Sequence, residues 1–196
     1  MTRVAIALGS NVGDRLAHLH VARTAISQRI GPVVGDSSAY ETAPIGGPEQ
    51  GPFLNGVVVV DTDLEPRAVL DQALAIERGA GRERGERWGP RTLDLDIILF
   101  GDTTVDEPGL TIPHPRLAER RFVLEPLIEA WPGATMPNGT PIATYLDAVA
   151  DQDVELFAPR IADEDSFEMG VKESVIVFIT VGLLAVGIWW LLGLFL

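Results

Sequence analysis

The chain has 196 residues, of which 46% are hydrophobic, and a formal net charge of −13. This length predicts one globular domain with its own core, and the negative charge argues against general nucleic-acid binding. The sequence contains no cysteine, which excludes disulfides and thiolate chemistry, and its one lysine is Lys172, close to the C-terminal apolar segment. Arginine must therefore supply the positive charge of any anion site in the globular part.

The first third of the chain reads as strand, helix and strand. An apolar, β-branched run at residues 4–8 predicts a strand, and apolar residues at helical spacing predict a helix over residues 15–30, with Asp14 as its N-cap. A second strand is predicted at residues 33–40. The glycine-rich turn before the helix could hold phosphate, but the absence of lysine and the presence of Asp14 favour a structural turn.

The middle of the chain adds a loop, a strand and a helix. Residues 41–52 are dense in proline and glycine, and a rigid loop of this kind could form one wall of a pocket. Residues 53–61 read as a third strand and residues 66–80 as a second helix. With a final strand ending at Gly101, the order predicts a ferredoxin-like βαββαβ core of the α+β class, an antiparallel sheet with two helices on one face.

The stretch Arg87 to Gly101 carries the strongest chemical signal. Its second half reads as a buried strand in which Asp94 and Asp96 share one face, while Leu93, Leu95, Ile97 and Leu99 are expected on the other. Two adjacent carboxylates in an apolar strand repel each other unless a cation lies between them, and a hard divalent ion suits oxygen ligands. An arginine cluster precedes them, at Arg78, Arg82, Arg84, Arg87 and Arg91. The pattern predicts a site for a metal-bound polyphosphate, with the glycine-flanked arginine segment as a mobile lid.

The C-terminus predicts a membrane anchor. Residues 175–196 contain no charge, and a helix of this length would span roughly 33 Å, enough to cross a bilayer. We therefore expect a domain at residues 1–157, an acidic flexible linker at 158–173 and a transmembrane helix at 174–196. A helix packed on the domain is the alternative. Because a domain that uses ATP belongs in the cytoplasm, we expect the anchor to hold it at the cytoplasmic side of the cell membrane.

The segment from Arg87 to Ile98 resembles the signature of 6-hydroxymethyl-7,8-dihydropterin pyrophosphokinases, enzymes of the folate pathway. The resemblance covers residues 1–157 and extends to Gly9-Ser10-Asn11, residues 40–46, Phe53-Leu54-Asn55, Gly81-Arg82, residues 110–114 and residues 120–124. It implies transfer of the β,γ-pyrophosphoryl unit of ATP to the pterin hydroxymethyl group, giving AMP, with two magnesium ions. The implied partners are ATP and the pterin, and the expected state is a monomer.

The resemblance also implies individual roles at the metal and nucleotide sites. Asp94 and Asp96 would hold both magnesium ions. Arg82 and Arg91 would grip the transferring phosphates, with Arg84 and Arg87 nearby. Contacts with ATP are implied for Glu77, Trp88, Ile97, Thr111, His114 and Arg120.

The implied pterin site lies between two aromatic rings. Phe53 and Phe122 would stack on the two faces of the pterin, and Asn55 would read its edge. Asp94 and the wall residues Thr42, Pro44 and Ile45 complete the implied contacts. Ordinary core packing is the alternative for both phenylalanines.

The sequence departs from the family pattern at four positions, which affect secondary contacts: Phe53, Leu74, Gly109 and Pro115. No residue is nominated as general base. Two other classes of function stay open, a non-catalytic nucleotide sensor and a membrane-tethered interaction module. The set of arginines, aspartates and histidine argues against a degenerate site.

Overall fold

The computed structural model describes residues 1–81 and 89–161. The elements in chain order are β1 (Thr2–Ser10), α1 (Arg15–Arg29), β2 (Val33–Asp36), β3 (Ala39–Thr42), β4 (Phe53–Thr62), α2 (Pro66–Gly79), β5 (Asp94–Phe100), β6 (Val105–Glu107), β7 (Leu110–Ile112), the 3₁₀ helix η1 (Leu117–Glu119), α3 (Arg121–Ala130), the 3₁₀ helix η2 (Ile142–Val149) and β8 (Glu155–Ala158).

One antiparallel sheet organises the molecule. Its strand order is β5-β1-β4-β3-β8, and β2 also pairs with β4. Each of these pairings is antiparallel. The α+β class and the antiparallel sheet predicted from the sequence are therefore confirmed.

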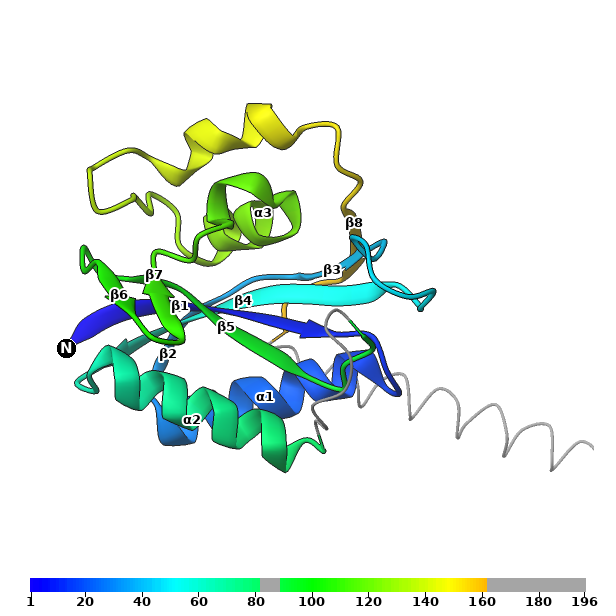
Figure 1. The fold of residues 1–196 in the computed structure, drawn as a ribbon, viewed down its shortest axis with the longest axis horizontal. Coiled ribbons are helices and arrows are strands. Elements are labelled where there is room, and N and C mark those ends of the chain that lie inside the picture. The colour runs from blue at the N-terminus through cyan, green and yellow to red at the C-terminus, as the bar shows by residue number, and fades with distance from the viewer. Residues whose placement is uncertain (82–88, 162–196) are drawn as a thin grey trace, which may run out of the picture. The chain divides into compact units, whose positions relative to one another are not determined.

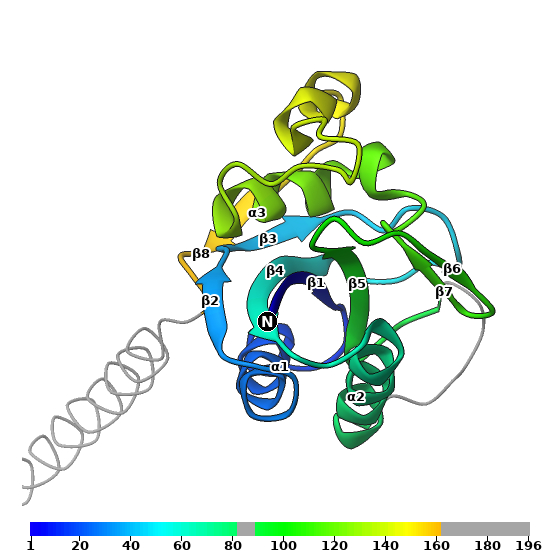
Figure 2. The ribbon, with the colours of Figure 1, turned by 90° about the vertical axis from the view of Figure 1, so that its left-hand side faces the viewer.

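Helices cover both faces of this sheet (Figures 1 and 2). The helices α1 and α2 lie on one face, where Ile6, Leu19 and Ala73 are fully buried. The helix α3 and the segment η2 lie on the other face, where Leu124 and Ile142 are fully buried. The sequence predicts the layer formed by α1 and α2, and it does not predict the layer formed by α3 and η2.

The helix α1 begins as predicted at an aspartate. Ala17 N donates to Asp14 Oδ1 at 3.1 Å, so Asp14 satisfies one of the free amides of the first turn. The glycine-containing turn between β1 and α1 thus has the structural role that the sequence favours.

The prediction of a single strand at residues 33–40 is wrong in detail, because the chain forms two strands there, β2 and β3, separated by Ser37 and Ser38. Ser37 Oγ donates to Ser38 O at 2.7 Å and accepts from Val57 N at 2.9 Å. Ser38 N donates instead to the Glu129 side chain of α3, at 2.9 Å. These side-chain contacts satisfy backbone groups that a continuous strand would pair with its neighbour.

A β-bulge interrupts β5. Ala5 of β1 pairs with Leu99, whereas Ile6 pairs with Ile97, so Ile98 is an extra residue on β5. Leu93, Leu95 and Ile97 face α1 and α2 as expected. The expectation that Leu99 shares their face is wrong, because the bulge shifts the alternation and places Leu99 in the layer beneath α3.

The described fold continues beyond the domain boundary expected at residue 157. Ala158 belongs to β8, and Ile161 is fully buried and donates its backbone N–H to Ser37 O at 3.0 Å. The expected transmembrane helix at 174–196 and the greater part of the expected linker lie outside the described residues. Within residues 1–81 and 89–161, none of the helices combines the length and the apolar character that a membrane crossing requires.

Candidate active site

A cavity of about 200 Å³ opens on the α3 side of the sheet. Residues from β1, the β3–β4 loop, β4, β5 and the β7–α3 connection line it together. Those that carry the argument below are Ala7, Gly9, Thr42, Ile45, Gln50, Phe53, Asn55, Arg91, Asp94, Asp96, His114, Arg116, Arg120 and Phe122. The structure thus gathers most of the described residues that the sequence nominates into one place.

Sheet register builds the floor of this cavity. Gly9 on β1, which lies between β4 and β5, pairs with Asn55 on one side and with Asp94 on the other, and Ala7 pairs with Asp96. Paired residues of adjacent strands project to the same face. A Cβ at Gly9 would lie 3.4 Å from Asn55 Oδ1, so the glycine leaves open the space between the amide and the carboxylate.

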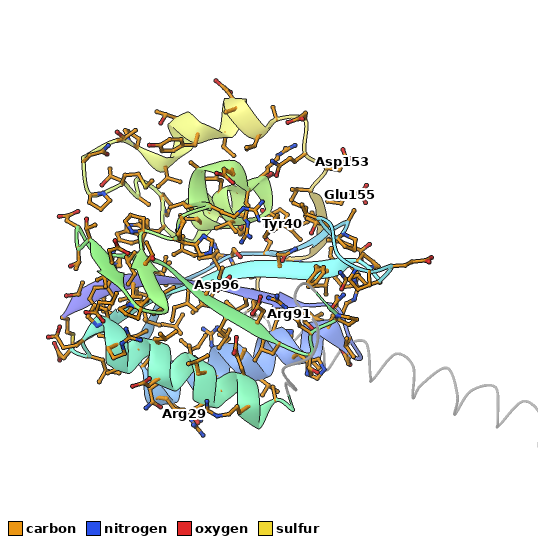
Figure 3. All side chains as sticks on the ribbon, in the orientation of Figure 1. Arg29, Tyr40, Arg91, Asp96, Asp153 and Glu155 are labelled. Carbon is orange, nitrogen blue, oxygen red and sulfur yellow. The ribbon has the colours of Figure 1, made fainter. Side chains whose placement is uncertain are left out.

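The two aspartates share one face of β5, as the sequence predicts, and both line the cavity. Arg91 Nη1 forms an ion pair with Asp94 Oδ2. Figure 3 labels Arg91 and Asp96 near β5. A magnesium ion takes few protein carboxylates and keeps water or phosphate oxygens as its other ligands. Two carboxylates on one face fit that ion, and in the described part of the chain no group of three or more acidic or histidine side chains forms a fuller metal cage.

His114 lies on the connection between β7 and α3, and the edge of the sheet holds it in place. Its backbone N–H donates to the Ile98 carbonyl of the bulge at 3.0 Å. Arg116 N donates to His114 Nδ1 at 3.1 Å, so this ring nitrogen accepts and the neutral ring carries its proton on Nε2. Burial, Arg120 and Arg116 lower the pKa of His114 from 6.5, which keeps the ring neutral near pH 7. A neutral histidine can then donate one hydrogen bond to an anionic ligand.

Aromatic and amide side chains line another part of the cavity. Phe53 is the first residue of β4, Phe122 lies in the first turn of α3, and both are partly exposed. Asn55 is buried and donates from Nδ2 to Thr42 Oγ1 at 2.8 Å. This bond fixes the orientation of the amide, whose Oδ1 lies on the Gly9 side. The arrangement suits a flat heterocycle with polar edges.

Sequence reasoning nominates no role for three polar side chains that line the site or connect its parts. Arg116 and Gln50 line the cavity. Asn11 does not line it but connects its parts, because Asn11 Nδ2 donates to Gln50 Oε1 at 2.9 Å and to Gly51 O at 3.3 Å. A signal for Asn11 was present, since it ends the Gly9-Ser10-Asn11 motif directly after a buried strand.

Four described residues nominated for substrate contacts do not line the cavity. Glu77 is buried on α2, where Oε1 accepts from Leu95 N at 2.8 Å. Ile97 is buried in the layer of α1 and α2, Thr111 is exposed on β7, and Pro44 lies in the loop beside the lining residue Ile45. The other nominated residues, Arg82, Arg84, Arg87 and Trp88, lie outside the described residues.

Comparison with known proteins gives the family. Residues 5–132 match the family described as 7,8-dihydro-6-hydroxymethylpterin-pyrophosphokinase (HPPK). The chain is 47% identical over 125 residues to the 2-amino-4-hydroxy-6-hydroxymethyldihydropteridine pyrophosphokinase of Bacillus subtilis, covering 63% of this chain and 75% of the relative. The enzyme of the same name from Mycobacterium tuberculosis is 42% identical over 191 residues, covering 89% of this chain and 97% of the relative.

Solved structures agree on the fold. An HPPK-DHPS protein in complex with substrates matches with a TM-score of 0.62 at 14% identity, over 76% of this chain and 43% of that longer chain. A second, HPPK-DHPS of Plasmodium falciparum with SDX-DHP, matches with a TM-score of 0.61 at 15% identity, over 76% of this chain and 44% of that one. At such identities the similarity shows the fold alone. The family match and the sequence relatives show that the chain belongs to the 7,8-dihydro-6-hydroxymethylpterin-pyrophosphokinase family, as its motifs predict.

Proposed function

We propose that the protein transfers the pyrophosphoryl unit of ATP to 6-hydroxymethyl-7,8-dihydropterin, releasing AMP, as an ATP-dependent diphosphotransferase of folate biosynthesis. One observation carries the proposal. A single cavity joins the Asp94–Asp96 pair to the aromatic and amide wall of Phe53, Phe122 and Asn55. A polyphosphate and a flat heterocycle can therefore meet in it.

The carboxylates of Asp94 and Asp96 would hold two magnesium ions together with the phosphates of ATP. Bound magnesium neutralises phosphate charge and orients the reacting oxygens. Arg91, which already pairs with Asp94, stands where a guanidinium fork can bind both a carboxylate and a phosphoryl oxygen. His114 and Arg120 supply further donors from the other wall.

The pterin would occupy the part of the cavity formed by Gly9, Thr42 and Asn55. Gly9 leaves the room, and the Asn55 amide, oriented by Thr42, presents Oδ1 to N–H donors on the pterin edge. Phe53 and Phe122 would stack on the ring. The hydroxymethyl oxygen would then attack the β-phosphorus directly, the bond from this phosphorus to the bridging oxygen would break so that AMP leaves, and the hydroxyl proton would pass to solvent. No covalent enzyme intermediate is needed, and no general base is assigned.

The decisive measurement is AMP release by the full chain with magnesium. AMP is expected only when ATP and 6-hydroxymethyl-7,8-dihydropterin are both present, and the pterin diphosphate should form in equal amount. A nucleotide sensor is the competing function. If the protein binds ATP tightly yet releases no AMP with the pterin, the sensor is correct and the proposed function is wrong.

The C-terminal segment would anchor the enzyme to the cytoplasmic side of the cell membrane. The support is its sequence, an uncharged stretch at residues 175–196. The full chain should pellet with membranes and resist extraction by alkaline carbonate, whereas a variant ending at residue 173 should stay in the supernatant. Full-length protein that is soluble without detergent would contradict the anchor. The monomeric state stays a prediction.

A further inference from the structure

The connection between β7 and α3 brings three nitrogen-bearing side chains to one wall of the cavity: His114, Arg116 and Arg120. The first and the last have a role in the proposed function. Arg116 has none, although its backbone N–H orients the His114 ring.

The Arg116 guanidinium is only partly engaged. Its Nε donates to Glu119 Oε2 at 3.1 Å, and the Arg116 side chain is 44% exposed. Among the described residues, no hydrogen bond is made by its two terminal nitrogens. These N–H groups lie on a cavity-lining side chain and are available to a ligand.

A bound anion would stabilise the charge of the neighbouring Arg120 more than that of Arg116. Arg120 is partly buried, its guanidinium lies 5.5 Å from the centre of the Phe122 ring, and within the described residues it forms no ion pair or side-chain hydrogen bond. Burial and the charge of Arg116 lower the pKa of Arg120 below its usual value. The two like charges on this wall repel each other, and an anion that contacts both would offset the repulsion.

The carboxylates of the site offset the positive charges of Arg116 and Arg120 only in part. Asp94 is engaged by Arg91, and Glu119, which holds Arg116 at Nε, is an exposed surface group. The charges of Asp96 and Asp94 oppose the lowering of the Arg120 pKa without cancelling it. A polyphosphate between the aspartates and the arginines, with magnesium on the carboxylate side, would be contacted by opposite charge on both sides.

We propose that Arg116 and Arg120 together form a clamp for the triphosphate of ATP, with Arg116 as a phosphate-binding residue of this chain. The inference rests on the proposed function, and it adds a phosphate contact from the connection between β7 and α3. Planar guanidinium forks can each present two donors to phosphoryl oxygens.

The test measures binding by calorimetry with two probes, magnesium ATP and magnesium tripolyphosphate, on the full chain without pterin. Arg116→Gln removes the charge and Arg116→Lys keeps it. Arg67→Gln is the matched control, because Arg67 also pairs with a glutamate, Glu107, and is 43% exposed against 44% for Arg116. Arg67 does not line the cavity.

Loss of a charge-assisted contact predicts that Arg116→Gln raises the dissociation constants of both probes roughly 10- to 100-fold. Arg116→Lys should retain part of the affinity, and Arg67→Gln should bind as the wild type does. Unchanged binding of both probes by Arg116→Gln would overturn the inference. The pterin alone is titrated separately as a control for the cavity, and an equal loss of its affinity in Arg116→Gln would also overturn the inference, because it indicates a general disturbance of the cavity.

The outcome for Arg116 is separate from the outcome for the reaction. Wild-type protein that binds tripolyphosphate but releases no AMP with the pterin contradicts the proposed function and leaves the clamp intact. Wild-type protein that releases AMP while Arg116→Gln binds both probes normally contradicts the clamp alone.

Discussion

Asn11 and Arg91 exchange two hydrogen bonds, and Arg91 lines the cavity. Asn11 N donates to Arg91 O at 3.0 Å, and Arg91 N donates to Asn11 Oδ1 at 2.7 Å. Because Asn11 Nδ2 also reaches Gln50 and Gly51, one side chain ties the end of β1 to the β3–β4 loop and to the segment that leads into β5. The proposed pterin wall and the proposed metal strand are thus fixed to each other through one amide.

Asn11→Ala should therefore disturb both walls. It leaves Arg91 N without its acceptor, which predicts a loss of about 1–3 kcal/mol in the free energy of unfolding. Loosening of the loop that carries Gln50 should raise KM for the pterin about tenfold. Urea denaturation and steady-state kinetics measure the two effects.

Asn138→Ala is the control for Asn11. Asn138 Oδ1 accepts from Thr140 N at 3.0 Å in an exposed turn away from the cavity. This variant should leave KM unchanged. Equal kinetic effects in the two variants would show that the Asn11 contacts have no special part in binding.

Asp96→Asn should abolish most of the turnover and leave the fold intact. The substitution keeps the shape of the side chain and removes the charge that a magnesium ion requires, so kcat is expected to fall roughly 100- to 1,000-fold. AMP release at saturating magnesium measures the loss. Asp63→Asn is the control, since Asp63 pairs with the N-terminal amine and its side chain is 74% exposed. Normal turnover of Asp96→Asn would exclude a metal-binding role.

Because the pKa of His114 is lowered in the folded state, the stability of the ligand-free protein should depend on pH. Burial first, and then Arg120 and Arg116, lower the pKa of His114 below the ordinary 6.5. Between the lowered folded pKa and 6.5 the unfolded chain binds more protons, so the free energy of unfolding falls as the pH falls through that window. The His114→Gln variant lacks this proton uptake.

The measurement for His114 is the melting temperature of wild type and His114→Gln from pH 7.5 to 5. Wild type should lose more stability on acidification than the variant does. Parallel curves for the two proteins would contradict the lowered pKa.

A substitution at Tyr40 should affect the stability of the fold and not the proposed reaction. The Tyr40 hydroxyl donates to Glu129 Oε2 at 2.8 Å, and Glu129 also accepts from Ser38, so this carboxylate joins α3 to β3. Figure 3 labels Tyr40 beneath α3. Tyr40→Phe should lower the free energy of unfolding by about 1–2 kcal/mol in urea titrations, with little change in kcat. Tyr145→Phe, at the other tyrosine, serves as control; an equal loss there would remove any special role for the Glu129 contact.

The same contact gives Tyr40 a pH signature. Burial and the Glu129 carboxylate raise its pKa above the ordinary 10.0, so the folded state keeps the proton longer than the unfolded state does. The stabilisation is complete below pH 10 and is lost as the pH rises further. Alkaline unfolding should thus depend less on pH in Tyr40→Phe than in wild type.

Much of the site could be predicted because strand alternation is local. The i,i+2 spacing of Asp94 and Asp96 already places them on one face, and the motifs around Phe53 and His114 supply neighbours that the fold brings together. The order of the four predicted strands and the two helices also follows from periodicity and turn residues, although the second of these strands is divided into β2 and β3.

Other features depend on contacts that sequence patterns do not reveal. The break at Ser37 and Ser38 depends on Glu129, which is distant in the chain. The helix α3 contains Pro126, a residue that normally argues against a helix interior. The contact of Glu77 with Leu95 N of β5 is a further example, and the ATP-binding role implied for Glu77 stays a prediction.

The bulge at Ile98 divides β5 into two parts that obey different constraints. Before the bulge, the pairing of β5 with β1 places Asp94 and Asp96, the proposed magnesium ligands, on one face. After the bulge, Leu99 and Phe100 fill opposite layers of the core. The extra residue also offers its carbonyl to His114 N. Deleting Ile98 would therefore leave the two carboxylates, Leu99 and Phe100 in register with β1, and it would remove the carbonyl that holds the histidine. The inserted residue thus binds the histidine to the edge strand and leaves the register on both sides of the bulge unchanged.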